Sequence, residues 1–381
     1  MKRLLTATLL GLILLGLSLT AQTPQPHTTK LGASLFWAIR GLESYPQQLD
    51  ANLRWIRTNL GADYVRVIVA LGGDKYRAAD GNYYDPWENA SVYPLVSIFE
   101  QRIAQTTDHI YDNYGLKVHW TIVGSGFHSE TRPMLDSLAD HFALQIRGRE
   151  HKVELVEAWN EYGQNGGNVA DLQYLGRRLR ANLGATFPIA LSSPEATHHE
   201  ATETALRTEI GQMFAGPDFG GASVFVYHAS RTTSRWRPAT ILRVLGPVPR
   251  YNSEPRGPGA SAGGDVSDPA TLAQDYRESI QANEAGYVYH SMPGVWGGHA
   301  VGFPDQNRWK NLWEVPNAEA IAAGLKALRG GPTTPANPVP QLPSDPLLPT
   351  PSSSDPIAVL MDLVRRVEIL EAIARRAGLM P

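Results

Sequence analysis

Two glutamates stand out in this sequence because each follows an apolar, strand-like segment. Glu161 ends the run EAWNE at 157–161, and Glu254 ends the run RYNSE at 250–254, 93 positions further on (254 − 161). Carboxyl groups held about 5–5.5 Å apart are what a retaining glycosidase needs, because one protonates the leaving oxygen while the other attacks the anomeric carbon. A lone glutamate at a strand end usually forms a structural salt bridge. The pair, with Asn160 beside the first, favours catalysis.

Such a pair must hold opposite protonation states. Burial and a neighbouring negative charge raise the pKa of the acid, whereas an arginine and hydrogen-bond donors keep the nucleophile ionised. Glu157 lies an even number of residues before Glu161, so we expect it to point into the same space. Arg66 or His119 should be its partner, because an unpaired buried carboxylate is costly.

Strand-like and helix-like segments alternate over residues 31–330 and should position these side chains. Eight such units in about 300 residues predict an α/β fold, a (β/α)8 TIM barrel, whose chemistry lies at the carboxyl ends of the strands. A doubly wound sheet is the alternative, but its usual glycine-rich turn is missing after the first strand. Helical periodicity covers 45–60, 94–114, 132–147, 169–183 and 272–285, and the expected strands are 31–37, 64–71, 116–123, 153–158, 189–192, 222–227, 248–251 and 285–289.

Aromatic residues crowd the segments that follow the second and eighth strands. Flat rings beside hydroxyl and amide groups suit the apolar faces of sugars, although such rings also simply pack loops against a core. The residues are Tyr76, Tyr83, Tyr84, Trp87 and Tyr93 in the first segment, and Trp296, Phe303 and Trp309 in the second.

Over residues 31–330 the chain resembles a clan A glycoside hydrolase, most closely family 5 and its relatives. The most specific match is EAWNE at 157–161, which is similar to the E-x-x-N-E motif at the end of strand 4 in that clan. The resemblance implies that Glu161 is the general acid/base and that Asn160 hydrogen-bonds the sugar 2-hydroxyl. It also implies that Glu254 is the nucleophile on strand 7.

The same resemblance implies a set of substrate-binding residues at the other strand ends. Arg66 matches the strand 2 arginine near the nucleophile, His119 the strand 3 histidine, and His228 the first position of an H-x-Y pattern on strand 6. Ser230 replaces the tyrosine of that pattern, so Tyr227 is expected to supply the hydroxyl. Two tryptophans complete the set, Trp296 under the reacting sugar and Trp37 at the end of strand 1.

The remaining motifs and the composition exclude several classes of function. Basic residues number 34 against 37 acidic ones, a formal net charge of −3, so nucleic acid is not an expected partner. The chain has no cysteine, which excludes disulfides and thiolate chemistry. The run HHE at 198–200 lacks the HExxH spacing, and GSG at 124–126 lacks G-x-S-x-G. We expect no metal and no cofactor.

Both ends of the chain differ in composition from the middle. Residues 1–21 are typical of a signal peptide, with a basic start and an apolar run, and the alternative is an uncleaved membrane anchor. We expect a secreted protein, extracellular or in the periplasm or cell envelope, with a short linker at 22–30. Nine prolines in 331–356 predict an extended linker. Residues 357–381 then form an amphipathic, coiled-coil-like helix, expected to self-associate through 357–379 or to dock on another protein or a membrane.

Two functional classes remain open. The first is a secreted retaining glycoside hydrolase that cleaves β-glycosidic bonds of a polysaccharide or glycan by double displacement with two glutamates. The second is a non-catalytic carbohydrate-binding or surface-structural protein built on a glycosidase-like barrel. Paired carboxylates favour the enzyme, because a binder does not need them. The linker, the terminal helix and the unusual Pro255 after Glu254 favour the second class.

Overall fold

The computed structural model describes most of the chain between residues 29 and 330. The expected signal peptide at 1–21, the linker at 331–356 and the helix at 357–381 fall outside the described residues. Within the described part, no helix combines the length and the hydropathy that crossing a membrane requires. The described ranges are 29–70, 96–124, 132–198, 202–228, 237–245, 248–259, 266–298 and 307–330.

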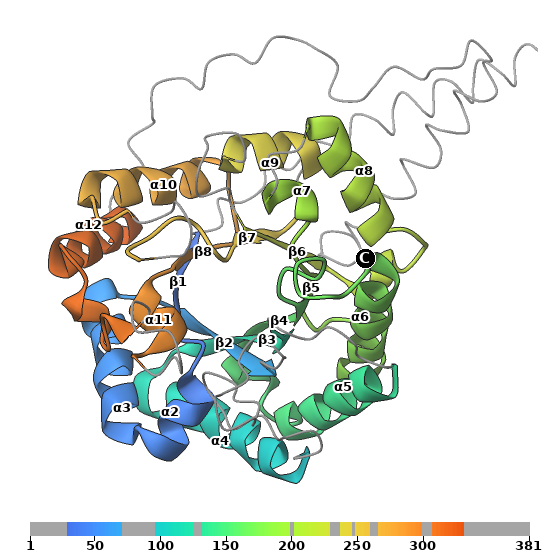
Figure 1. The fold of residues 1–381 in the computed structure, drawn as a ribbon, viewed down its shortest axis with the longest axis horizontal. Helices are drawn as coiled ribbons and strands as arrows, with labels where there is room; N and C mark the ends of the chain where they lie inside the picture. The colour runs from blue at the N-terminus through green and yellow to red at the C-terminus, as the bar shows by residue number, and fades with distance from the viewer. Residues whose placement is uncertain are drawn as a thin grey trace, which may run out of the picture.

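Eight parallel strands form a closed barrel in sequence order, with β8 paired to β1 (Figure 1). Each strand overlaps the segment predicted for it, so the predicted (β/α)8 architecture is the observed one. The strands are β1 (Lys30–Ser34), β2 (Tyr64–Ala70), β3 (Lys117–Val123), β4 (Val153–Trp159), β5 (Ile189–Leu191), β6 (Val224–Tyr227), β7 (Arg250–Asn252) and β8 (Gly286–Tyr289).

Helices surround the barrel and follow the strands in order (Figure 1). Three of them begin at a side-chain cap, Asn168, Thr202 or Asp268, whose oxygen accepts a backbone N–H three residues later at 2.9–3.2 Å. The helices are α2 (Ala38–Ser44), α3 (Pro46–Trp55), η1 (Ile56–Leu60), α4 (Val96–Tyr114), α5 (Arg132–Ile146), η3 (Glu150–Lys152), α6 (Val169–Leu183), α7 (Glu195–His198), α8 (Glu203–Met213), η4 (Phe219–Gly221), α9 (Pro238–Leu245), α10 (Pro269–Gln281), α11 (Met292–Trp296), η6 (Leu312–Glu314) and α12 (Ala318–Gly330).

The strands are mostly apolar because both of their faces are buried, as in β4, where every residue is buried. Outward side chains pack with the helices in the main hydrophobic core. Inward side chains form a second, smaller cluster that fills the barrel, within which the rings of Tyr64 and Tyr251 meet edge to face at 6.0 Å. Its members are Tyr64, Leu155, Ala190, Val224, Val226, Tyr251 and Val288. The barrel interior is therefore packed up to the level at which polar residues begin.

Candidate active site

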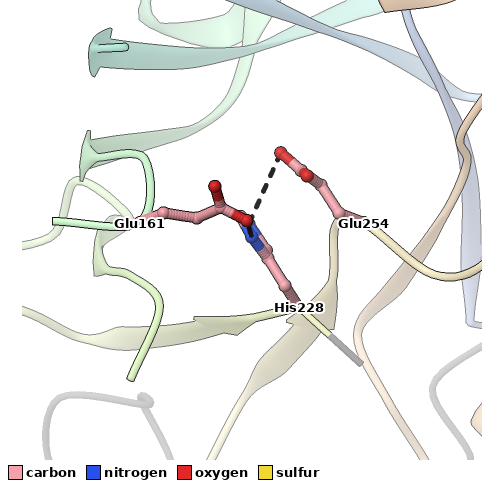
Figure 2. A group of neighbouring side chains, drawn as sticks. All are labelled: Glu161, His228 and Glu254. Atoms are coloured by element: carbon pink, nitrogen blue, oxygen red, sulfur yellow. Dashed lines mark hydrogen bonds and ion pairs between the residues drawn. The ribbon is translucent and has the colours of Figure 1, made fainter. Parts of the chain in front are cut away.

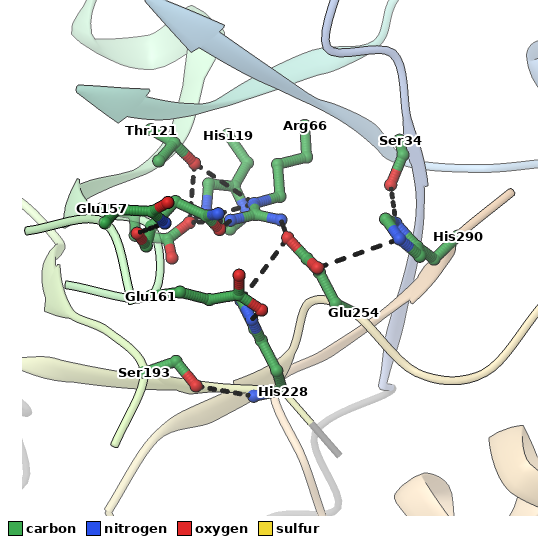
Figure 3. A network of polar contacts seen from close by, with 12 residues as sticks. Ser34, Arg66, His119, Thr121, Glu157, Glu161, Ser193, His228, Glu254 and His290 are labelled. Atoms are coloured by element: carbon green, nitrogen blue, oxygen red, sulfur yellow. Dashed lines mark hydrogen bonds and ion pairs between the residues drawn. The ribbon is translucent and has the colours of Figure 1, made fainter. Parts of the chain in front are cut away.

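The inward face of four strands changes from apolar to polar within a single two-residue step. On β2, β4, β6 and β8, the inward residue after the apolar cluster is Arg66, Glu157, His228 and His290 respectively. Side chains alternate along a strand, so all four point into the barrel at its carboxyl-terminal end. Each is at most 3% exposed. Figure 3 shows them as one network with residues from the other strand ends.

Arg66 is the centre of this network. Its Nη1 donates to Glu254 Oε1 at 2.6 Å, its Nη2 to Asn160 Oδ1 at 2.7 Å, and its Nε to Glu157 Oε2 at 3.0 Å. The guanidinium also lies 5.0 Å from the centre of the Phe36 ring, a cation–π distance. One buried cation thus fixes the carboxylate after β7 and the amide after β4 relative to each other.

Glu157 balances the charge of that cation from inside the barrel. Its Oε2 accepts from Thr121 Oγ1 at 2.6 Å and lies 3.0 Å from His119 Nε2. Burial by itself would raise the pKa of Glu157, but Arg66 and His119 outweigh burial and lower the pKa to about 2. Burial lowers the pKa of His119, which keeps its imidazole neutral. Arg66 and His119 are thus both partners of Glu157, and His119 faces this carboxylate.

Glu161 and Glu254 meet across the mouth of the barrel (Figure 2). One carboxylate oxygen of each lies within 4.8 Å of the other, so the two carboxyl groups meet as predicted. The carboxyl groups of inverting glycosidases are kept further apart, by about 6.5–9.5 Å. The side chain of Glu161 is 18% exposed and that of Glu254 only 5%. The more exposed carboxyl can exchange protons with solvent, while the buried one is bound to Arg66.

The imidazole of His228 lies against both glutamates. Its Nδ1 is 2.9 Å from Glu161 Oε1, and its Nε2 is 3.7 Å from Glu254 Oε1. Its backbone N–H donates to Ser193 Oγ at 3.2 Å, which ties the end of β6 to the end of β5. The three side chains are close enough for a divalent cation to bridge them. Arg66 already occupies Glu254 Oε1 with a positive charge, which opposes a second cation there.

Besides Glu157 and Ser193, three further polar residues of the network were not among the predicted site residues. His290, directly after β8, lies 3.8 Å through Nε2 from Glu254 Oε2 and 2.7 Å through Nδ1 from Ser34 Oγ. Ser34 ends β1, and Thr121 lies on β3. The positions of Ser34 and Thr121 follow from inward alternation, Thr121 two residues after His119. The alternation of inward and outward side chains along each strand is therefore enough to predict that Ser34 and Thr121 face the barrel interior.

Three predicted substrate-binding residues do not join the two carboxylates. Tyr227 is adjacent to His228 and so faces outward, where its hydroxyl donates to Glu284 Oε1 at 2.5 Å. Trp37 is fully buried, and its indole N–H donates to the Pro293 carbonyl at 2.9 Å. Trp296 ends α11 and packs, partly buried, against the main hydrophobic core.

The structure thus corrects the expectation that Tyr227 supplies the missing hydroxyl of H-x-Y. It also places His290 directly after β8, at the position where the resemblance led us to expect a tryptophan. The aromatic residues expected after the second strand, together with Phe303, fall outside the described residues.

Comparisons with known proteins find similarity in the fold but not in the sequence. No protein-family model and no curated protein matches this sequence. A glycoside hydrolase family 5 structure from Bacteroides vulgatus superposes with a TM-score of 0.51 at 12% identity, over 79% of this chain and 66% of that chain. SrfJ from Salmonella typhimurium gives 0.48 at 13% identity, covering 78% and 74%. A psychrophilic family 10 endo-β-1,4-xylanase gives 0.46 at 11% identity, covering 78% and 96%.

Identities this low show a shared fold. The family 5 structure confirms the predicted (β/α)8 barrel fold, and this chain spans about two thirds of that protein's length.

Proposed function

We propose that this protein is a retaining glycoside hydrolase in which Glu254 is the nucleophile and Glu161 is the general acid/base. The observation that carries the proposal is the approach of the two carboxylates within 4.8 Å at the ends of β4 and β7. Their unequal surroundings support the division of roles. Glu254 is bound by a buried arginine, which stabilises its ionised form, whereas Glu161 is the more exposed of the two and contacts an imidazole.

In the first chemical step, a carboxylate oxygen of Glu254 bonds to the anomeric carbon of the sugar. The glycosidic carbon–oxygen bond breaks, and the departing oxygen takes the proton of Glu161. Arg66 holds Glu254 during this step, and Asn160, fixed by the same guanidinium, is in place to donate to a sugar hydroxyl. The result is a glycosyl ester of Glu254.

In the second step, Glu161, now ionised, removes a proton from water. The resulting hydroxide oxygen bonds to the anomeric carbon and releases Glu254. His228 Nδ1 lies 2.9 Å from Glu161 Oε1, within hydrogen-bonding distance of the carboxyl group that loses and regains the proton. Two displacements restore the original anomeric configuration.

We further propose that the substrate is a β-linked polysaccharide or glycan met outside the cytoplasm. The resemblance of 157–161 to the clan A motif supports the β linkage, and the signal-like sequence at 1–21 supports export. The alternative remains a non-catalytic carbohydrate-binding protein. A buried arginine, a histidine and two carboxylates that converge on one point are more than a binding surface needs, and this favours the enzyme.

A panel of β-linked polysaccharides, with products resolved by size and anomeric configuration followed by proton NMR, tests the proposal. We expect hydrolysis of at least one polymer with net retention, abolished in the Glu254→Gln variant and unchanged by a metal chelator. Inversion of configuration would contradict the mechanism. Polymer binding without any hydrolysis would favour the carbohydrate-binding alternative.

A further inference from the structure

Ser34 and His290 meet where the barrel closes. In the β1–β8 register, Ala33 is opposite Tyr289, so the next residue of each strand, Ser34 and His290, faces the barrel interior side by side. Ser34 Oγ lies 2.7 Å from His290 Nδ1, a short hydrogen bond, and the two residues are 0% and 3% exposed. The other ring nitrogen of His290 points towards Glu254 Oε2, 3.8 Å away (Figure 3).

Close backbone contacts hold both residues in place. A Cβ at Gly257, in the segment after Glu254, would lie 1.8 Å from the His290 carbonyl oxygen. A Cβ at Gly294 would lie 2.3 Å from the Ser34 carbonyl oxygen. Only glycine permits backbone approaches of this kind. The segment after β7 therefore packs against the backbone of His290, and helix α11 packs against the backbone of Ser34. Both contacts restrict movement of the Ser34–His290 pair.

We propose that Ser34 and His290 are a positioning pair for the nucleophile Glu254, an inference that rests on the proposed function. The Ser34 hydroxyl donates to His290 Nδ1, which leaves the ring proton on Nε2 and directs that N–H at Glu254 Oε2. Arg66 already holds Oε1 at 2.6 Å. A donor on Oε2, in addition to Arg66 on Oε1, helps to fix the plane of the carboxylate.

The 3.8 Å separation between His290 Nε2 and Glu254 Oε2 is too long for a hydrogen bond. Catalytic hydrogen bonds in ligand-free enzymes are often long and shorten when substrate binds. The Ser34–His290 bond acts by setting which nitrogen carries the proton, because the opposite tautomer would direct a bare nitrogen lone pair at the carboxylate.

Nitrogen-15 NMR of histidine-labelled full-length protein tests the tautomer without any substrate. His290→Gln identifies the signals of residue 290 by their disappearance. In the wild-type protein we expect Nδ1 to resonate as an unprotonated nitrogen and Nε2 as a protonated one. In Ser34→Ala the protonated-Nε2 pattern should be lost or mixed with the other tautomer. A wild-type spectrum with Nδ1 protonated, or one that Ser34→Ala leaves unchanged, would overturn the inference.

Kinetics on the best substrate of the panel test the positioning role. For Ser34→Ala we expect kcat to fall about tenfold with KM within about twofold, because the lost interaction acts on the nucleophile during reaction and not on substrate binding. His290→Leu should lose about 100-fold, while His290→Gln, which keeps a side-chain N–H donor, should recover part of that loss.

The matched control is Ser223→Ala, which removes a serine hydroxyl bound to Arg180 outside the barrel and should leave kcat unchanged. Equal losses in the Gln and Leu variants of His290 would overturn the positioning role. A wild-type protein that hydrolyses no polymer would instead contradict the proposed function, and the NMR result would still decide the tautomer.

Discussion

Arg66 is the single side chain on which most of the site geometry depends. The planar guanidinium of Arg66 donates hydrogen bonds to Glu254, Asn160 and Glu157. Arg66→Lys keeps the positive charge but replaces the guanidinium with a single ammonium group. We expect activity to fall at least about 100-fold and stability by about 3–5 kcal/mol, because buried carboxylates lose partners. Enzyme assays and urea unfolding measure the two effects. Arg177→Lys, at an exposed ion pair with Asp218, is the control and should change neither.

The two glutamates should respond differently to the same substitution. Glu254→Gln removes the nucleophile, so every substrate should lose activity regardless of its leaving group. Glu161→Gln removes the acid, which matters only when the departing oxygen needs a proton. An aryl glycoside with a low-pKa phenol should therefore give a burst of phenol followed by slow turnover, because the glycosyl-enzyme lacks its base.

Azide, which needs no base, should accelerate that slow phase, and stopped-flow absorbance of the phenolate follows both phases. Cleavage of the polymer should be nearly abolished in Glu161→Gln. A burst in Glu254→Gln together with a Glu161→Gln variant inactive on all substrates would mean that the two roles are reversed.

At the scale of elements, the end of β4 holds Glu161 in a backbone conformation that favours glycine, with φ of +47°. In the left-handed region a side chain costs about 1–2 kcal/mol. Comparing Glu161→Gly with Glu161→Ala removes the carboxyl from both proteins and isolates the backbone effect. The glycine variant should be at least as stable as the alanine variant by thermal unfolding.

Ala323→Gly, at an exposed position in the middle of α12, is the control. There glycine should be less stable than alanine by about 0.5–1 kcal/mol. If Glu161→Gly shows that same deficit, the backbone at residue 161 is not strained.

Glu284, buried between the barrel and its helices, should make the unfolding free energy depend on pH independently of the active site. Burial raises its pKa to about 7, an effect that Arg250 and the Tyr227 hydroxyl only partly offset. Below pH 4.5, folded and unfolded chains both keep this proton. As pH rises from 4.5 to 7, the unfolded chain releases the proton first, so the unfolding free energy should fall by about 3 kcal/mol.

Denaturant unfolding between pH 5 and pH 8 measures this slope. Glu284→Gln should flatten it, because glutamine does not titrate and its oxygen can still accept from Tyr227. Asp268→Asn, an exposed helix cap, is the control for changing a carboxylate to an amide and should leave the slope in place. An unchanged slope in the Glu284 variant would assign the effect to other groups.

The strands and both carboxylates could be predicted because buried parallel strands and strand-end acids leave local patterns. Alternation within one strand would also have excluded Tyr227 once His228 was placed inward. Contacts between residues far apart in the sequence could not be predicted in this way. The β1–β8 register that brings Ser34 to His290 depends on barrel closure, which leaves no local pattern in the sequence. Trp296 ends α11, a five-residue helix that follows β8, and its role as a substrate-binding residue stays a prediction.

At the scale of the whole molecule, we propose that the protein self-associates through residues 357–379. Deleting residues 331–381 should leave a folded barrel, because α12 completes the ring of helices by residue 330, and activity on a small aryl glycoside should be unchanged. Sedimentation velocity should show an oligomer for the full chain and a monomer for the truncated one. A full chain that is monomeric at micromolar concentration would rule out self-association.

Closure of the barrel by its first and last strands also has a consequence for biosynthesis. Ser34 and His290 are separated by 256 residues, so a ribosome must release nearly the entire barrel before β8 can pair with β1. Glu161 and Glu254, which follow β4 and β7, emerge earlier, but Glu254, the proposed nucleophile, has neither His290 nor a finished barrel until β8 emerges. Contacts this distant along the chain also slow folding. A nascent or prematurely terminated chain therefore carries the reactive groups without the means to use them.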